Sequence, residues 1–110
     1  MSEIRVAEYL DSSGRSSFRR WFDALEATAA AKVSTALYRL GQGNFSNVKG
    51  VGSGVFEYRI DFGPGYRVYF GKDGPTVVIL LGGGTKKRQS RNISAAAEAW
   101  DDYKRRKPAR

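Results

Sequence analysis

Five side chains that could take part in chemistry alternate along two short segments of the chain. Glu57, Arg59 and Asp61 occupy every second position of the first segment, and Arg67 and Tyr69 do so in the second. The chain has no histidine and no cysteine, so acid–base chemistry would have to use carboxylates, lysine, arginine or tyrosine. Two interpretations stay open: a site for a phosphate-bearing ligand, or ordinary charge contacts worth roughly a few tenths of a kcal/mol each.

A β-hairpin is predicted to place these five side chains together. Apolar residues fill the intervening positions, which is typical of a half-buried sheet. A three-residue loop at Gly63–Gly65 keeps all apolar residues on one face, whereas a two-residue loop would mix the faces. The expected cross-strand pairs are Phe62–Tyr66, Asp61–Arg67, Ile60–Val68 and Arg59–Tyr69. The five polar or charged side chains then share the face away from the core.

The N-terminal half is predicted to hold one strand and two helices. Alternating apolar residues predict a strand over Glu3–Leu10. Ser16 or Ser17 can cap a first helix, and Thr28 can cap a second one that runs to about Leu40. The first helix has its apolar face at Phe18, Trp21, Phe22 and Leu25.

The C-terminal half is predicted to hold a loop, the hairpin, a buried strand and a helix. Residues 42–53 have the composition of a loop, anchored by Phe45. The apolar run Thr76–Leu81 predicts a central strand covered on both faces, which Gly82–Gly84 would end. These glycines would allow close approach of a ligand or a neighbouring chain. A last helix, capped by Asn92, has its apolar stripe at Ile93, Ala96, Ala97, Trp100 and Tyr103.

Length and charge restrict the class of protein. The 110 residues suit one domain, 1–110, with residues 104–110 as a flexible basic tail. The net charge of +8 favours a polyanionic partner such as nucleic acid or the ribosome, with an acidic protein or an anionic membrane as alternatives. The lack of a signal peptide and of a long apolar run favours a cytoplasmic protein that does not enter the membrane. No metal site or cofactor is expected.

Three segments together resemble a known family. They are N-F-S-N-V-K-G-V-G-S-G-V-F-E-Y-R-I-D-F-G-P-G-Y-R-V-Y-F (residues 44–70), L-L-G-G-G-T-K-K-R-Q (residues 80–89), and a closing helix with alanines and Trp100. The chain resembles the RelE/ParE toxin superfamily, and within it the HigB-like addiction module killer proteins. It departs from the group's pattern at Gly84-Thr85, where an acidic residue is common, and at Lys87-Arg88, where small polar residues are usual.

The resemblance implies both a fold and a function. The fold would be α+β: a strand, a helical hairpin, three antiparallel strands and a short helix, with all helices on one side of the sheet. The protein would be the toxin of a type II toxin–antitoxin pair. A cognate antitoxin would neutralise it and repress the shared operon, carrying the complex to operator DNA.

The expected activity is that of a ribosome-dependent, metal-independent mRNA endoribonuclease that inhibits translation. RelE-like members cleave mRNA in the ribosomal A site, whereas ParE-like members poison DNA gyrase. A gyrase poison therefore remains an alternative, as does a non-catalytic basic module that binds nucleic acid. The lack of histidine predicts weak cleavage of free RNA, with the ribosome holding the message in line.

The resemblance also implies roles for residues of the hairpin face. RNA cleavage needs a base for the 2′-hydroxyl, a cation for the phosphorane and an acid for the leaving oxygen. Arg67 is expected to stabilise the phosphorane, and Glu57 to act as base or to orient an arginine. Tyr69 is expected to stack an RNA base or to share a proton network. The other expected contributors are Arg59, Lys49 and Lys86 at catalytic positions and Lys87, Arg88 and Arg91 as RNA contacts.

Overall fold

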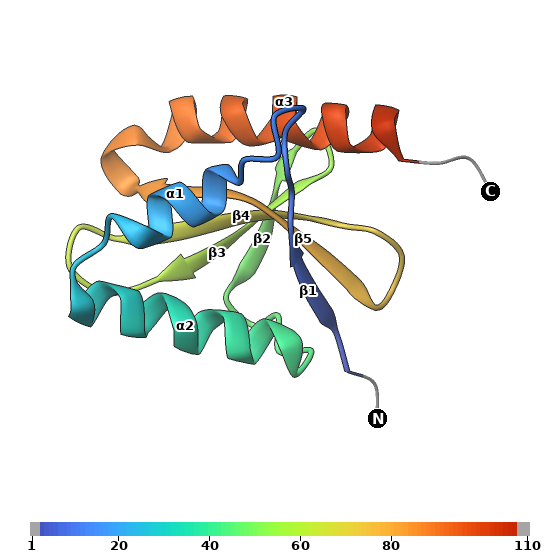
Figure 1. Ribbon diagram of the computed structural model, residues 1–110. Helices are drawn as coiled ribbons and strands as arrows, with labels where there is room; N and C mark the ends of the chain where they lie inside the picture. Colours follow the sequence, from blue (N-terminus) through green and yellow to red (C-terminus); the bar gives the residue numbers. More distant parts are fainter. Residues whose placement is uncertain (1–2, 108–110) are drawn as a thin grey trace.

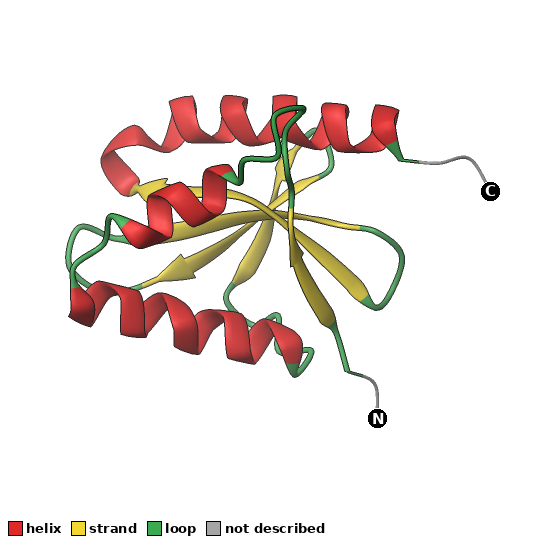
Figure 2. Cartoon of the chain, in the orientation of Figure 1, coloured by secondary structure: helices red, strands yellow, loops and turns green. Residues whose placement is uncertain are grey.

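A five-stranded sheet with helices on both faces forms the body of the protein (Figures 1 and 2). The computed structural model describes residues 3–107. The elements are β1 (Arg5–Glu8), α1 (Ser17–Asp23), α2 (Ala27–Gly41), β2 (Val48–Gly52), β3 (Val55–Ile60), β4 (Tyr66–Lys72), β5 (Val77–Thr85), the 3-10 helix η1 (Lys86–Arg88) and α3 (Gln89–Arg106). The sheet order is β1-β5-β4-β3-β2, with β1 parallel to β5 and the other pairs antiparallel. The expected α+β class is confirmed, with a mixed sheet.

Strand β5 has the central, doubly covered position that its apolar run predicts. Val78 and Leu80 face the core formed with α1 and α2, whereas Ile79 and Leu81 face the core formed with α3. All four side chains are buried. Helices on both faces explain why this strand is apolar without alternation.

The triple glycine does not end β5, which continues to Thr85. A Cβ at Gly83 would lie 2.3 Å from the ring of Trp21 in α1, and one at Gly84 would lie 1.7 Å from the amide of Asn92 in α3. The groups that approach these two glycines belong to helices of this chain, not to the ligand or neighbouring chain that was predicted. The glycines therefore let α1 and α3 pack against the strand.

The expected hairpin register is wrong by two residues. The observed cross-strand pairs are Ile60–Tyr66, Arg59–Arg67, Tyr58–Val68, Glu57–Tyr69 and Phe56–Phe70. Residues 61–65 form the connection, because Gly63 and Gly65 take positive φ angles of 56° and 80° and Phe62 N–H turns back to bond Ile60 O at 2.9 Å. A shift of two keeps every side chain on its predicted face.

The helices differ from the expected one-sided arrangement. Helices α1 and α2 cover one face and α3 the other, which Figure 1 shows with α3 above the sheet and α2 below it. The last helix is 18 residues long, not short, and Asn92 lies inside it rather than at its cap. It continues to Arg106, into the segment expected to be a tail, of which residues 108–110 lie outside the described residues.

Other predictions for the N-terminal half have mixed outcomes. Ser16 caps α1 by accepting a hydrogen bond from Arg19 N–H at 2.9 Å, which confirms one of the two candidates. The residue that caps α2 is Glu26, not Thr28. The Glu26 carboxylate accepts a hydrogen bond from Thr28 N–H at 3.0 Å. The segment predicted as a loop contains β2, although Phe45 does pack against the core as expected.

Two apolar clusters lie on opposite faces of the sheet. The cluster under α1 and α2 contains Phe18, Val33, Ala36, Leu40, Tyr58, Ile60, Val68, Phe70, Val78 and Leu80. The cluster under α3 contains Tyr9, Val55, Tyr69, Ile79, Leu81, Ala96 and Trp100. Within residues 3–107, no helix combines the length and the apolar character needed to cross a membrane.

Candidate nucleic-acid interface

Four cationic side chains meet at one corner of the sheet, on the face that α3 partly covers. Lys49 of β2 pairs with Glu57, and Arg59 of β3 pairs with Arg67 of β4, so the cations of the three strands share that face. Lys86 joins them from η1. Its N–H bonds Gly65 O at 3.0 Å, and Arg67 Nη1 donates to the same oxygen at 3.1 Å. The Gly65 carbonyl thus holds Lys86 beside Arg67.

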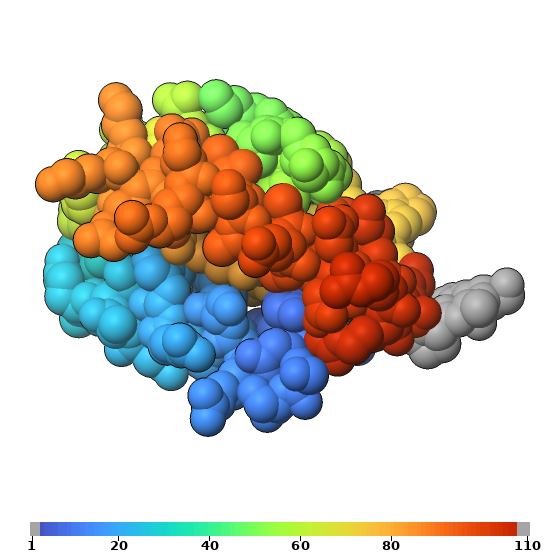
Figure 3. All heavy atoms as spheres, turned by 90° about the horizontal axis from the view of Figure 1, so that it is seen from above, coloured from blue at the N-terminus to red at the C-terminus, as the bar shows by residue number. Residues whose placement is uncertain are grey.

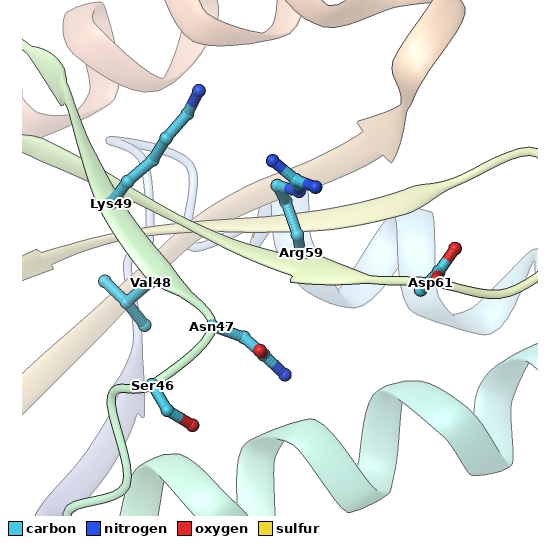
Figure 4. A pocket seen from close by; sticks show the side chains of 6 residues that line it. All are labelled: Ser46, Asn47, Val48, Lys49, Arg59 and Asp61. Carbon is cyan, nitrogen blue, oxygen red and sulfur yellow. The ribbon is translucent and has the colours of Figure 1, made fainter.

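Two hollows form the surface at this corner. One, of about 400 Å³, is lined by Ser46, Asn47, Val48, Lys49, Arg59 and Asp61. The other, of about 130 Å³, is lined by Arg59, Ile60, Asp61, Gly65, Tyr66, Arg67 and Lys86. Figure 4 shows Lys49, Arg59 and Asp61 rising from their backbone on the same side. Arg59 and Asp61 line both hollows, which therefore form one continuous surface, called here the cationic corner.

The cations of this corner differ in exposure and in contacts. Lys49, Arg59 and Lys86 are exposed, and none of them lies within 4.0 Å of a carboxylate in the described part of the chain. Arg67 is only 8% exposed and is fixed by its bond to Gly65 O. The corner therefore combines one buried, hydrogen-bonded guanidinium with three exposed cations, an arrangement suited to phosphate groups.

Behind Arg67 lies a buried polar cluster that the sequence does not reveal. The carboxylate of Glu57 is fully buried, and its Oε2 accepts from Gln89 Nε2 at 2.7 Å and from Tyr69 OH at 3.2 Å. Arg67 Nε lies 3.4 Å from the same oxygen, as an ion pair. Glu57 Oε1 and Arg67 Nε, both buried, form no hydrogen bond within residues 3–107. The cluster orients Arg67 from behind and neutralises part of its charge.

Two sequence-based roles are corrected by this burial. Tyr69 has no exposed surface, so the prediction that it stacks an RNA base is wrong: its ring packs in the core under α3. The other predicted role, in a proton network, agrees with the hydrogen bond that its hydroxyl donates to Glu57. Burial, and next the adjacent Glu57 carboxylate, raises the pKa of Tyr69. Glu57 lies beneath Arg67 rather than at the surface, which leaves the orienting role and excludes direct contact with RNA in this structure.

The remaining predicted RNA contacts lie beside the corner. Lys87 and Arg88 belong to η1 and Arg91 to the first turn of α3, and all three are exposed. They do not line either hollow. Figure 3 shows the orange segment that carries η1 and the start of α3 projecting outward from the surface. These cations extend the positive surface without belonging to the hollow itself.

Sequence reasoning missed two contributors to the site: Gln89 holds Glu57, and Gly65 O joins Arg67 to Lys86. Asp61, which the sequence placed on this face without a catalytic role, is the carboxylate that lines both hollows. The alternation of charges placed Asp61 on this face but paired it with Arg67. No pattern marked Gln89, because its role depends on where α3 begins. Among the described residues, no group of three or more His, Cys, Asp or Glu side chains could hold a metal ion.

Comparison with known proteins gives one relative that covers most of this chain. No family model matches the sequence. An uncharacterized protein of Haemophilus influenzae is 44% identical over 80 residues, which span 72% of this chain and 81% of that protein. This chain therefore belongs to the same protein family as the Haemophilus influenzae protein.

Proposed function

We propose that the protein is a RelE/ParE-like, HigB-like toxin of a type II toxin–antitoxin pair that cleaves mRNA on the ribosome. One observation carries the proposal: Lys49, Arg59, Arg67 and Lys86 line two adjoining hollows that share Arg59, and Asp61 is the one carboxylate of their lining among the described residues. Such a surface favours a phosphate chain over a neutral ligand. The order of strand, two helices and antiparallel strands also agrees with the fold that the resemblance implies.

The proposed reaction transfers a phosphoryl group within the RNA. The 2′-hydroxyl loses its proton to a base and its oxygen bonds the adjacent phosphorus. The bond from phosphorus to the 5′-oxygen breaks, and that oxygen takes up a proton. The products are a 2′,3′-cyclic phosphate and a 5′-hydroxyl end, so no metal or cofactor is required.

Three groups of the corner have roles in this scheme. The fixed guanidinium of Arg67 stabilises the extra negative charge of the phosphorane, a contact typically worth about 3 kcal/mol of barrier. Asp61 takes the place of Glu57 as proton acceptor, because its carboxylate is exposed in the hollow. Lys86, held beside Arg67, is placed to protonate the leaving oxygen.

The remaining cations of the corner bind the RNA and take no part in the chemical step. Arg59 and Lys49 line the larger hollow and would hold flanking phosphates of the message. The ribosome would hold the reacting nucleotides in line, which compensates for a site without histidine. The cognate antitoxin would cover this surface with acidic side chains and carry the pair to operator DNA. Action on ribosomes and mRNA would take place in the cytoplasm.

One observation favours a second candidate, the ParE-like gyrase poison. Burial of Glu57 leaves Asp61 as the carboxylate of the corner, and a toxin that acts by binding needs no proton acceptor. Such a protein would arrest growth without cutting RNA. A basic module that only binds nucleic acid would neither arrest growth nor cut RNA.

Controlled expression in growing bacteria separates these candidates. The protein is induced with and without the neighbouring open reading frame, and the ends of cellular mRNAs are mapped together with the integrity of the DNA. Cuts in phase with codons, on translated messages and suppressed by the neighbouring frame, are the expected result. Intact messages with broken DNA would instead identify a gyrase poison, and normal growth would reject both toxins.

A further inference from the structure

The cationic corner does not end at the face that α3 covers. Strand β2 begins at Val48, opposite Tyr58, and just before it Asn47 O accepts a hydrogen bond from Arg59 N–H at 3.1 Å. Beyond Arg59, no strand among residues 3–107 pairs with this edge of β3. The sheet therefore has a free edge at residues 60–61. The surface can pass round this edge to the opposite face.

A third hollow lies on the other side of that edge, against α2. It has a volume of about 300 Å³ and is lined by Lys32, Thr35, Ala36, Arg39, Asn47, Tyr58, Arg59, Ile60, Asp61 and Phe62. Arg59 and Asp61 line all three hollows, and Asn47 lines two of them. The three hollows thus meet at the free edge of β3. The surface continues from η1, past β3, to α2.

The α2 side of this surface is also cationic. Lys32 and Arg39 lie seven positions apart on α2, about two helical turns, and both are exposed. Neither forms an ion pair with a carboxylate of the described residues. Lys32 Nζ lies 5.1 Å from the centre of the Phe62 ring, which holds the ammonium group over the hollow. Asp61, at the shared edge, is the carboxylate in its lining.

We infer that Lys32 and Arg39 form a second phosphate-binding subsite, which holds the part of a single RNA strand that leaves the cationic corner round the edge of β3. This inference rests on the proposed function, because it takes RNA as the ligand of the corner. Phosphates recur at regular intervals along a strand, so a continuous cationic path fits a chain better than a single anion. A short RNA fills the corner alone, and a longer one reaches α2.

The test compares two lengths of RNA that the protein cannot cleave. Fully 2′-O-methylated oligouridines of roughly four and roughly twelve nucleotides lack the attacking hydroxyl and span the usual range of single-strand sites. Their dissociation constants are measured by fluorescence anisotropy at several salt concentrations. The variant Lys32→Gln/Arg39→Gln removes two charges from the subsite but keeps polar side chains.

A matched control removes the same charge elsewhere. Arg5 of β1 and Arg20 of α1 are exposed and line none of the three hollows, so Arg5→Gln/Arg20→Gln has an equal net charge. A third variant, Arg59→Gln/Lys86→Gln, weakens the corner itself. Thermal unfolding of each variant verifies that it is folded.

The inference predicts a loss confined to the longer RNA. Lys32→Gln/Arg39→Gln should bind it on the order of tenfold more weakly, with the slope of log affinity against log salt reduced by about 1.4, while binding of the short RNA is unchanged. Equal affinities of this variant and the control for the longer RNA overturn the inference. If, in that case, only the Arg59→Gln/Lys86→Gln variant binds both RNAs more weakly, the proposed function still stands. Failure of the wild-type protein to bind either RNA overturns the inference, whereas the proposed function is decided separately by the mapping of mRNA ends after controlled expression.

Discussion

The face of the hairpin that α3 crosses has a covered end and an open end. At the covered end Glu57 and Tyr69 are fully buried. At the open end Arg59, only two residues further along β3, is exposed, and Arg67 lines a hollow. The same alternation in sequence covers all four residues, yet Glu57 and Tyr69 belong to the core, whereas Arg59 is exposed and the buried Arg67 borders a hollow.

The position of α3 produces this difference. A Cβ at Gly71 would lie 2.5 Å from the ring of Trp100, which shows how closely the helix lies over that part of β4. At the start of this helix, Gln89 Nε2 donates a hydrogen bond to the buried Glu57 Oε2 at 2.7 Å. Alternation therefore decides which face a side chain takes, and the crossing helix decides whether water reaches it. The covered end should govern stability and the open end binding.

The largest effect is expected from Trp100→Ala at the covered end. Trp100 is 6% exposed, stacks on Tyr103 at 5.2 Å and packs with Tyr69, so its removal opens a large cavity. The free energy of unfolding should fall by about 3–5 kcal/mol in urea titrations. Tyr38→Ala, at a site 68% exposed, is the control and should change it by less than about 0.5 kcal/mol. Equal losses in the two variants would contradict the comparison.

Glu57→Ala should have the next largest effect, because it leaves the guanidinium of Arg67 buried without its counter-charge. A loss of about 2–3 kcal/mol in the free energy of unfolding is expected. The matched carboxylate at the open end, Asp61→Ala, should cost less than about 0.5 kcal/mol. The double variant Glu57→Ala/Arg67→Met should recover part of the loss. If the loss of free energy in the double variant equals the sum of the losses in Glu57→Ala and Arg67→Met, the two side chains are not coupled.

Alkaline pH should lower the free energy of unfolding through tyrosines buried at the covered end. Since burial and Glu57 raise the pKa of Tyr69, the unfolded chain loses this proton first, above about pH 10. The stabilising contribution is complete below that pH and is lost as the pH rises toward the native pKa, at about 1.4 kcal/mol per pH unit for this group. Tyr9, whose pKa burial and Asp102 also raise, adds to the same trend.

Urea unfolding between about pH 9 and about pH 11 measures this dependence. The free energy of unfolding of Tyr69→Phe should fall less steeply with pH than that of the wild-type protein. The variant lacks one of the two tyrosines whose pKa is raised in the folded protein. Identical slopes would mean that Tyr69 does not hold its proton more tightly in the folded protein.

The smallest effect on stability is expected at the open end. Arg59→Gln/Lys49→Gln should change the free energy of unfolding by less than about 0.5 kcal/mol, because both side chains are exposed and unpaired among the described residues. The same variant should weaken binding of a short oligoribonucleotide and reduce its salt dependence by about 1.4 in the log–log slope. A destabilised variant with unchanged RNA binding would reverse the proposed roles of the two ends.

The sequence predicts which face of the sheet each side chain takes, but not which part of that face a helix covers. Period-two alternation correctly placed Tyr58 and Val68 on one side and Arg59 and Arg67 on the other. The exact pairing was not predictable, because the loop of residues 61–65 depends on a local turn at Phe62 that a glycine pattern does not specify. A register wrong by two residues leaves the faces intact.

The composition of the site was predicted less well than its location. Lys49, Arg59, Arg67 and Lys86 do lie around one surface, as their positions on and beside the hairpin suggested. Burial of Glu57 depends on an 18-residue helix that arrives from the other end of the chain, and no local pattern records that contact. Charged residues in an alternating strand therefore look alike in sequence whether they are buried or exposed.

Cleavage of mRNA on purified ribosomes tests the central claim most directly. Ribosomes stalled on a defined message are incubated with the wild-type protein, Arg67→Gln or the charge-matched Arg5→Gln/Arg20→Gln control, and primer extension maps new 5′ ends. We expect cuts by the wild-type protein and the control, a loss on the order of 100-fold with folded Arg67→Gln, and little cleavage of the message without ribosomes. Undiminished cutting by Arg67→Gln, or no cutting by the wild-type protein, would contradict the assignment of the cationic corner as a ribonuclease site.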